Sequence, residues 1–309
     1  MDLTIAPNPF FWSAESVRRF YDGLADAPVA RVVVGELVCS KRLPFWQNEI
    51  PQAVEFLQAA GKQVALTSLA LITLRRERKL TADLLGMGLP VEVNDLSALH
   101  HIPAGMPFWV GPLVNVYNEG TLRWLARRGA ERICLPPELP MASIAVLAGI
   151  AQAEGVALEV WGHGRLPLAI SARCYHARLH ERAKDSCQFV CEEDPDGRDV
   201  DTLEGQQFLT VNGVQTLSQS YACMAEHVAE YQDMGVSALR LQPQSVGFHT
   251  ICDDYAQLLA GDLPANALIE TLSAAHPDMQ FCDGYGHCGT GASWSHGASS
   301  ARNVPTGCS

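Results

Sequence analysis

Eight short runs rich in β-branched and apolar residues, all but one followed by a stretch with helical periodicity, constrain the fold of this chain most strongly. Such alternation predicts a parallel sheet with crossover helices. The runs are 30–38, 63–71, 90–95, 106–114, 131–138, 157–164, 207–217 and 237–244. Eight units are the number in a closed barrel, which needs about 250 residues. A doubly wound open sheet is the alternative, but no Gly-x-Gly-x-x-Gly turn follows the first run.

The regular alternation is interrupted once, after the sixth run. Instead of a helix, residues 166–199 form a long segment rich in cysteine and charge, and long insertions in compact domains tend to be functional. We therefore predict an α/β fold with a TIM-barrel-like (β/α)8 core and a Cys-rich insertion after the sixth strand.

Four cysteines are expected to meet at one face of this barrel. Cys174, Cys187 and Cys191 lie in the insertion, and Cys39 directly follows the first run. The carboxyl ends of all barrel strands emerge at the same face, where the active sites of such barrels are built. We therefore expect Cys39 and the cysteines of the insertion to lie close together at that face, although they are far apart in the sequence.

Cysteine thiolates are the soft ligands of iron–sulfur clusters and of structural zinc, and both take four. Zinc sites usually contain a Cys-x-x-Cys pair, which these four positions lack. The Arg, Lys and His residues between Cys174 and Cys187 would lower thiol pKa values and offset the charge of a tetrathiolate cluster. An iron–sulfur cluster, a zinc ion and ordinary buried thiols, among ten cysteines in all, remain the three interpretations.

Charge and hydropathy exclude several classes of protein. The net charge of −12 argues against a nucleic-acid-binding surface. The N-terminus shows no signal-peptide pattern, and no apolar run is long enough to span a bilayer. We expect a cytoplasmic protein, whose cysteines stay reduced and are available for metal or redox chemistry.

The composition changes near the C-terminus. We predict one α/β barrel domain over residues 1–283, carrying the metal site, and a flexible Gly/Ser-rich tail over 284–309. Cys282, Cys288 and Cys308 lie in or beside the tail. A second metal site that includes His287 is the alternative to a disordered tail.

Several segments resemble the collagenase-like U-type peptidase family. They include GELVCSKR (35–42), GHGRLPLAISARC (162–174) and KDSCQFVCEEDPDGR (184–198), and weaker similarity extends to about Tyr285. Over residues 282–291 the chain reads CDGYGHCGTG, where relatives tend to end in a Cys-Asn-Gly-Tyr-Trp-like sequence. The resemblance implies a TIM-barrel-like fold.

The similarity is strongest to members of that family that carry a 4Fe–4S cluster. The resemblance assigns its four ligands to Cys39, Cys174, Cys187 and Cys191. It also implies a role as a subunit of an oxygen-independent hydroxylase in ubiquinone biosynthesis. The implied partners are a paralogous subunit of the UbiU type, in a heterodimer, a lipid-binding accessory protein of the UbiT type, and a ubiquinone precursor.

Residues that contact substrate are harder to assign. Polar side chains at strand ends are weak catalytic candidates, and arginine suits a carboxylated substrate. They are Glu36, Arg42, Arg173 and Arg240. A zinc-stabilised barrel acting as a scaffold or hydrolase is one alternative function. An RNA-modifying hydroxylase of the same family is another, which the acidic charge disfavours.

Overall fold

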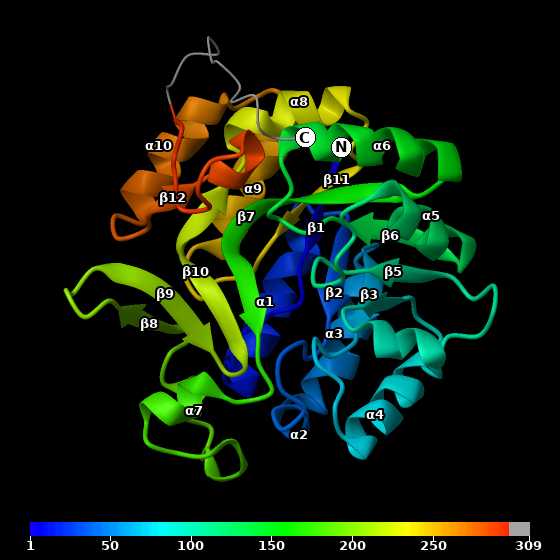
Figure 1. The fold of residues 1–309 in the computed structure, drawn as a ribbon, viewed down its shortest axis with the longest axis vertical. Coiled ribbons are helices and arrows are strands. Elements are labelled where there is room, and N and C mark those ends of the chain that lie inside the picture. Colours follow the sequence, from blue (N-terminus) through cyan, green and yellow to red (C-terminus); the bar gives the residue numbers. More distant parts are fainter. Residues whose placement is uncertain (297–309) are drawn as a thin grey trace.

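The computed structural model describes residues 1–296, whose core is a closed barrel of eight parallel strands (Figure 1). Strand β11 closes it by pairing with both β7 and β1. The barrel strands are β1 (Asp2–Ile5), β2 (Arg31–Val34), β3 (Gln63–Thr67), β4 (Val91–Val93), β5 (Phe108–Val110), β6 (Ala130–Cys134), β7 (Ala157–Ile170) and β11 (Ala238–Leu241). The predicted TIM-barrel-like fold is confirmed.

One barrel strand differs from the prediction. The first strand is the four-residue β1, too short to stand out as a run, and the predicted strand 207–217 lies outside the barrel. That segment forms β9 (Gln207–Asn212) and the start of β10 (Gln215–Cys223), an antiparallel hairpin turned at Gly213. The Asn-Gly pair is a strong hairpin signal that periodicity alone overlooks. Consequently, the Cys-rich insertion follows the seventh barrel strand, β7, and not the sixth.

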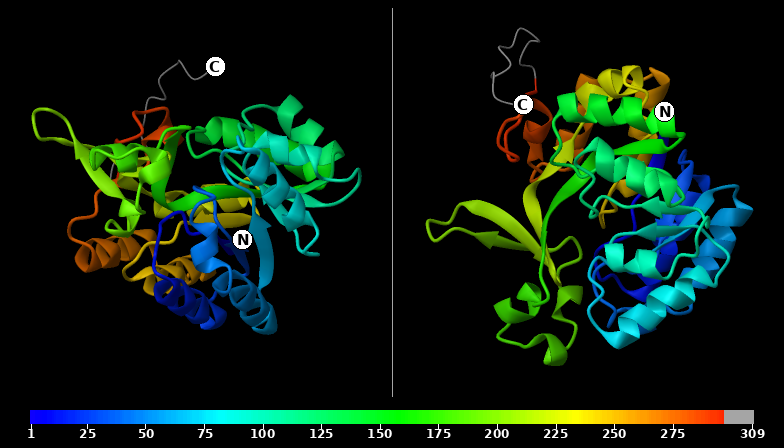
Figure 2. Two further views of the ribbon diagram at one scale, coloured as in Figure 1. Left: turned by 90° about the horizontal axis from the view of Figure 1, so that it is seen from below. Right: turned by 45° about the vertical axis from the view of Figure 1, so that its right-hand side comes forward.

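Long β7 continues beyond the barrel and carries this extension. Its distal half pairs antiparallel with β10, and β9 pairs in turn with β8 (Arg198–Asp201). Figures 1 and 2 show the extension projecting from the barrel beside the segment that contains α7 (Tyr175–Leu179). The short strand β12 (Phe281–Cys282) joins the same sheet along β10. The extension thus holds both ends of the Cys-rich segment.

Helices surround the barrel. The α-helices besides α7 are α1 (Ala14–Asp26), α2 (Leu43–Trp46), α3 (Glu49–Ala59), α4 (Arg75–Leu85), α5 (Glu119–Arg127), α6 (Met141–Glu154), α8 (Val228–Asp233), α9 (Phe248–Ala260) and α10 (Ala265–Ala275). The 3-10 helices are η1 (Leu96–His100), η2 (Lys184–Ser186), η3 (Val190–Glu192), η4 (Ala225–His227) and η5 (Gly284–His287). Within residues 1–296 no helix has the length and hydrophobicity needed to cross a bilayer.

The start of the predicted tail packs against β12. Ser295 N donates a hydrogen bond to Asp283 Oδ1 at 3.0 Å, and the rings of Trp294 and Phe281 lie 5.8 Å apart. Residues 297–309, which include Cys308, lie outside the described part of the chain. The flexibility of the tail over 284–309 and the single domain over 1–283 remain predictions.

The barrel strands bury a network of charges. Arg240 Nη2 donates to Glu92 Oε2 at 2.6 Å and to Glu159 Oε2 at 2.8 Å, and Arg132 Nη1 reaches Glu159 Oε1 at 3.1 Å. Glu159 is fully buried, and Thr4 also donates to it. Burial alone would raise the pKa of Glu159, but Arg240 and Arg132 hold it below its usual value. These compensated charges link β1, β4, β6, β7 and β11 across the barrel.

Arg240→Met should therefore destabilise the fold strongly. It removes the guanidinium that pairs with Glu92 and weakens the compensation of Glu159, and breaking a buried ion pair costs about 3–5 kcal/mol. Urea unfolding followed by circular dichroism measures the loss. Arg123→Met, which removes a half-exposed ion pair with Glu154, is the control expected to stay near wild type. An unchanged unfolding midpoint for Arg240→Met would contradict the role of the network.

Candidate metal centre

The structure brings the cysteine-bearing loops together at the carboxyl end of the barrel. Cys39 follows β2 and Cys174 follows β7, and both pack against a small apolar cluster of Leu37, Val38 and Val214. Helices α2 and α7, which flank these loops, lie at the same end of the barrel (Figure 1). Cys174 is close enough to Cys191 and Cys187 for their charges to affect its pKa. The convergence expected from barrel geometry is present.

Arg42 lies among these cysteines. Its side chain is 1% exposed, and it donates hydrogen bonds to the carbonyl oxygen of Pro9 at 2.8 Å and to Asn212 Oδ1 at 3.0 Å. Burial alone would lower its pKa, but Glu36, Cys191 and Cys39 raise it above the ordinary value. The guanidinium is therefore a fixed positive charge that favours negative charge on the neighbouring sulfurs.

Glu36 fixes the loop that carries Cys39. One carboxylate oxygen, Oε1, accepts the backbone N–H groups of Val38 at 2.6 Å and of Cys39 at 2.8 Å. Burial raises the pKa of Glu36 to about 7, although Arg42 and both N–H groups act against this rise. The side chain thus replaces the backbone partners that this irregular loop lacks.

The insertion has a constrained backbone. Cys174 caps α7, with Sγ accepting from Ala177 N at 3.4 Å. Glu181, Gln188 and Phe189 adopt positive φ angles, which are rare for residues other than glycine and cluster at functional sites. Lys41 Nζ donates to the carbonyl oxygen of Lys184 at 2.7 Å and so ties the insertion to the Cys39 loop.

The thiols of Cys39 and Cys174 are not activated nucleophiles. Burial raises the pKa of both, although Arg42 lowers that of Cys39 and the Ala177 N–H lowers that of Cys174. A thiol with a raised pKa is mostly protonated at neutral pH and reacts slowly. A soft metal centre would displace these protons, because only the thiolate is a ligand.

The sulfurs are spaced more widely than the ligands of one ion. Among residues 1–296, two groups of three His, Cys, Asp or Glu side chains have all donor atoms within 4.8 Å of one another, and neither contains a cysteine. Tetrahedral zinc with Zn–S bonds of about 2.3 Å would hold its sulfurs roughly 3.8 Å apart. No three of the four sulfurs therefore lie as close together as the ligands of one zinc ion.

The four weak catalytic candidates lie in three different places. Glu36 and Arg42 lie at the cysteines, where both are buried and engaged as described above. Arg173 is exposed near Cys174, and its backbone N–H donates to Ser171 Oγ. Arg240 belongs to the charge network of the barrel and not to the cysteine site.

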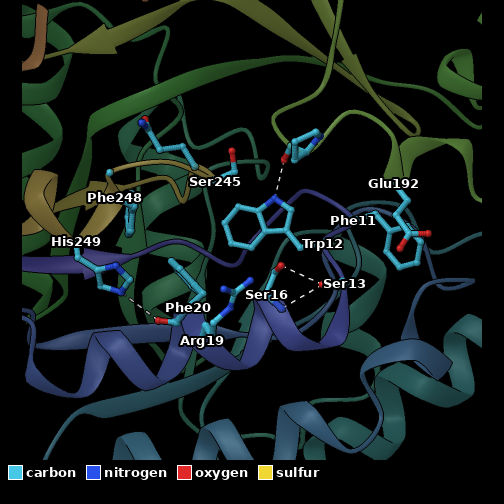
Figure 3. A pocket seen from close by; sticks show the side chains of 13 residues that line it. Phe11, Trp12, Ser13, Ser16, Arg19, Phe20, Glu192, Ser245, Phe248 and His249 are labelled. Atoms are coloured by element: carbon cyan, nitrogen blue, oxygen red, sulfur yellow. Dashed lines mark hydrogen bonds between the residues drawn. The ribbon is translucent and has the colours of Figure 1, made fainter. Parts of the chain in front are cut away.

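A cavity of about 560 Å³ lies beside α1 and the start of α9 (Figure 3). Trp12, Phe20 and Phe248 form its aromatic walls, and Arg19 and Glu192 add opposite charges. Glu192, which follows Cys191 in the sequence, connects the lining of the cavity to the Cys-rich segment. Sequence reasoning missed this cavity. The FFWS run (10–13) after β1 was its only local signal, and β1 itself was not predicted.

Comparisons with known proteins identify one family. The sequence matches the family model described as Peptidase family U32 over residues 12–253. Among solved structures, a designed cube-shaped, porous protein cage is similar at 11% identity with a TM-score of 0.41, covering 90% of this chain and 74% of that one. The second catalytic domain of a group II chitinase from Ostrinia furnacalis is similar at 10% identity with a TM-score of 0.37, covering 90% and 97%. These two scores are too low to support any argument about function.

Removal of the Glu36 carboxylate should loosen the Cys39 loop. Glu36→Ala loses two buried hydrogen bonds, each worth about 0.5–1.5 kcal/mol, so local opening should increase about tenfold or more. Alkylation of Cys39 in metal-free protein, followed by peptide mass spectrometry, measures this opening. Glu36→Gln keeps an oxygen acceptor and should react at nearly the wild-type rate. Equal rates for Glu36→Ala and wild type would show that the carboxylate does not hold the loop.

Proposed function

Because this chain belongs to peptidase family U32, we propose that it is a UbiV-like iron–sulfur subunit of an oxygen-independent hydroxylase in ubiquinone biosynthesis. Cys39, Cys174, Cys187 and Cys191 would hold a 4Fe–4S cluster. When bound, such a cluster supplies one-electron transfer, since four thiolates leave no iron position open to substrate. The proposed partners are a UbiU-like paralogous subunit and a UbiT-like lipid-binding protein, in the cytoplasm.

The convergence of Cys39, Cys174 and Cys191 on one buried arginine, with Cys187 close to Cys174, carries this proposal. The donor set is entirely sulfur, which suits iron–sulfur clusters and zinc better than magnesium or calcium. No three of the sulfurs lie within 4.8 Å of one another, whereas one tetrahedral zinc ion would hold its sulfurs roughly 3.8 Å apart. A cluster with four thiolates carries net negative charge, and the buried guanidinium of Arg42 would offset it.

The chain's own residues would prepare this site. Glu36 orients the Cys39 loop through two backbone N–H groups, and Lys41 holds the insertion against it. Phe189 packs on Phe11 and Phe45, with ring centroids 5.7 and 4.7 Å apart, and so limits the access of water from that side. The hydrogen bonds and packing around a cluster tune its reduction potential, so these residues would act on its redox chemistry without touching the iron.

The aromatic cavity is the proposed place for the ring of a ubiquinone precursor. Its aromatic walls offer stacking surfaces, and Arg19 offers a positive charge for an acidic substituent. Glu192 in the lining follows Cys191 in the sequence, so a bound ring would contact the segment that carries this cysteine. No Gly-x-Ser-x-Gly or His-Glu-x-x-His motif occurs in the sequence, so nothing in it favours proteolysis.

Metal analysis tests the proposal directly. The protein is purified without oxygen, together with a UbiU-like partner, and its iron, acid-labile sulfide and zinc are measured. We expect about four irons and four sulfides per chain, as in a 4Fe–4S protein. Cys174→Ala should lose the cluster and fail to restore anaerobic quinone synthesis in a strain that lacks the native protein.

Cys252→Ala is the matched control for this substitution. Cys252 is buried in α9, away from the four proposed ligands, so this variant should keep both iron and sulfide. Zinc without sulfide in the wild type would replace the cluster by the zinc-stabilised scaffold. Full iron content in Cys174→Ala would refute the ligand assignment.

A further inference from the structure

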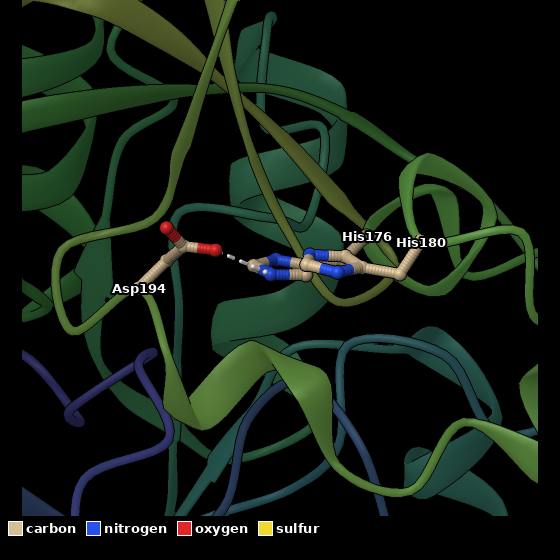
Figure 4. Close-up of side chains that lie close together, drawn as sticks. All are labelled: His176, His180 and Asp194. Carbon is tan, nitrogen blue, oxygen red and sulfur yellow. Dashed lines mark hydrogen bonds and ion pairs between the residues drawn. The ribbon is translucent and has the colours of Figure 1, made fainter.

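We propose that His176, His180 and Asp194 form a second metal site, which binds one divalent transition-metal ion outside the cysteine set. The three side chains offer donor atoms that all lie within 4.8 Å of one another. Figure 4 shows the two imidazole rings side by side, with Asp194 directed toward His176. The proposal does not depend on a cluster at the cysteines or on a role in quinone synthesis.

The local fold places these three groups. His176 lies in α7 and His180 is its C-terminal cap, so an i, i+4 spacing brings both rings to one side. The rings are nearly parallel, with an interplanar angle of 3° and centroids 5.7 Å apart. Asp194 comes from the turn that follows η3, and it therefore approaches the pair from a different segment.

The distances suit a shared ion. His176 Nε2 lies 2.9 Å from Asp194 Oδ2. Two ligands that bind one tetrahedral zinc ion at about 2.0–2.1 Å are separated by roughly 3.4 Å. An ion could therefore replace the hydrogen bond between these two groups after a shift of roughly 0.5 Å, and the donor atom of His180 lies within 4.8 Å of both.

His176 is buried more deeply than Asp194. Its side chain is fully buried, and its second nitrogen, Nδ1, has no hydrogen-bond partner in the described structure. Asp194 is only 15% exposed, whereas His180 is half-buried and open to solvent. The site therefore has a rigid inner side and an outer side through which an ion and its waters could enter.

The donor set selects the kind of ion. Two imidazoles and one carboxylate suit zinc or ferrous iron, whereas magnesium and calcium prefer oxygen ligands. Arg198 lies 3.5 Å from Asp194 Oδ1, and the charge of Arg42 also reaches His176. These cations reduce the attraction for a positive ion, so the imidazole bonds must supply most of the affinity.

The location suggests what a bound ion would do. Cys174 caps α7, which carries His176, and Asp194 follows Cys191 by three residues. An ion would cross-link the two segments that bear these cysteines. It would thereby hold the insertion in its observed conformation without touching a sulfur.

A count of bound zinc tests this site. Protein purified without oxygen, with its iron and sulfide measured, is dialysed against micromolar free Zn²⁺, and zinc per chain is determined. His180→Ala and Asp194→Asn should each carry one zinc fewer than wild type, with unchanged iron, sulfide and circular dichroism. His100→Ala, which removes an exposed histidine at the end of η1, should carry as much zinc as wild type.

The difference between variants separates this site from the cysteines. Zinc bound to free thiols is common to all four proteins and cancels in the comparison. Equal zinc in wild type, His180→Ala and Asp194→Asn would overturn the proposal, whatever the iron content. A protein that lacks iron but still shows the one-zinc difference would refute the cluster and support this second site.

Discussion

The hydrogen bonds of Arg42 hold together the segments on which the candidate metal centre depends. Its guanidinium joins the segment after β1, through the carbonyl oxygen of Pro9, to β9, through Asn212. Its charge also faces Glu36 and two of the cysteines. The buried guanidinium of Arg42 is therefore shared by three segments that are far apart in the sequence. Without it, the loop after β2 and the sheet extension would have no common polar partner.

Two of the buried charge networks within residues 1–296 shift the pKa of a glutamate in opposite directions. In the barrel, Arg240 and Arg132 outweigh the desolvation of Glu159, and its pKa falls. At the cysteines, desolvation of Glu36 outweighs the attraction of Arg42, and its pKa rises to about 7. A carboxyl group that is partly protonated near neutral pH does not cancel Arg42. Arg42 also lies 3.9 Å from Glu36, whereas Arg240 bonds Glu92 and Glu159 at 2.6 and 2.8 Å, so the guanidinium at the cysteines is less closely paired than the one in the barrel.

The sequence predicted the barrel because its strands are short, apolar and separated by clear helices. It predicted the meeting of Cys39 with the insertion because parallel strands share a carboxyl-terminal face. The sequence did not reveal β1, because four residues are too few to show a strand-like hydrophobic pattern. Residues 207–217 were assigned to the barrel because apolar and polar residues alternate in the same way in a barrel strand and in a hairpin. The position of Arg240 and the closure of the aromatic cavity depend on tertiary packing, so the FFWS run (10–13) alone could not reveal either.

The long β7 strand explains why an insertion at this point can be both irregular and rigid. Its inner half belongs to the closed barrel, and its outer half pairs with β10, which returns the chain to the barrel wall. The segment between β7 and β8 is therefore anchored at both ends by one continuous sheet. Residues with positive φ can persist there because the surrounding pairing determines their conformation. A segment that is fixed in this way can present cysteines, histidines and an aspartate at defined positions, although it contains little regular structure of its own.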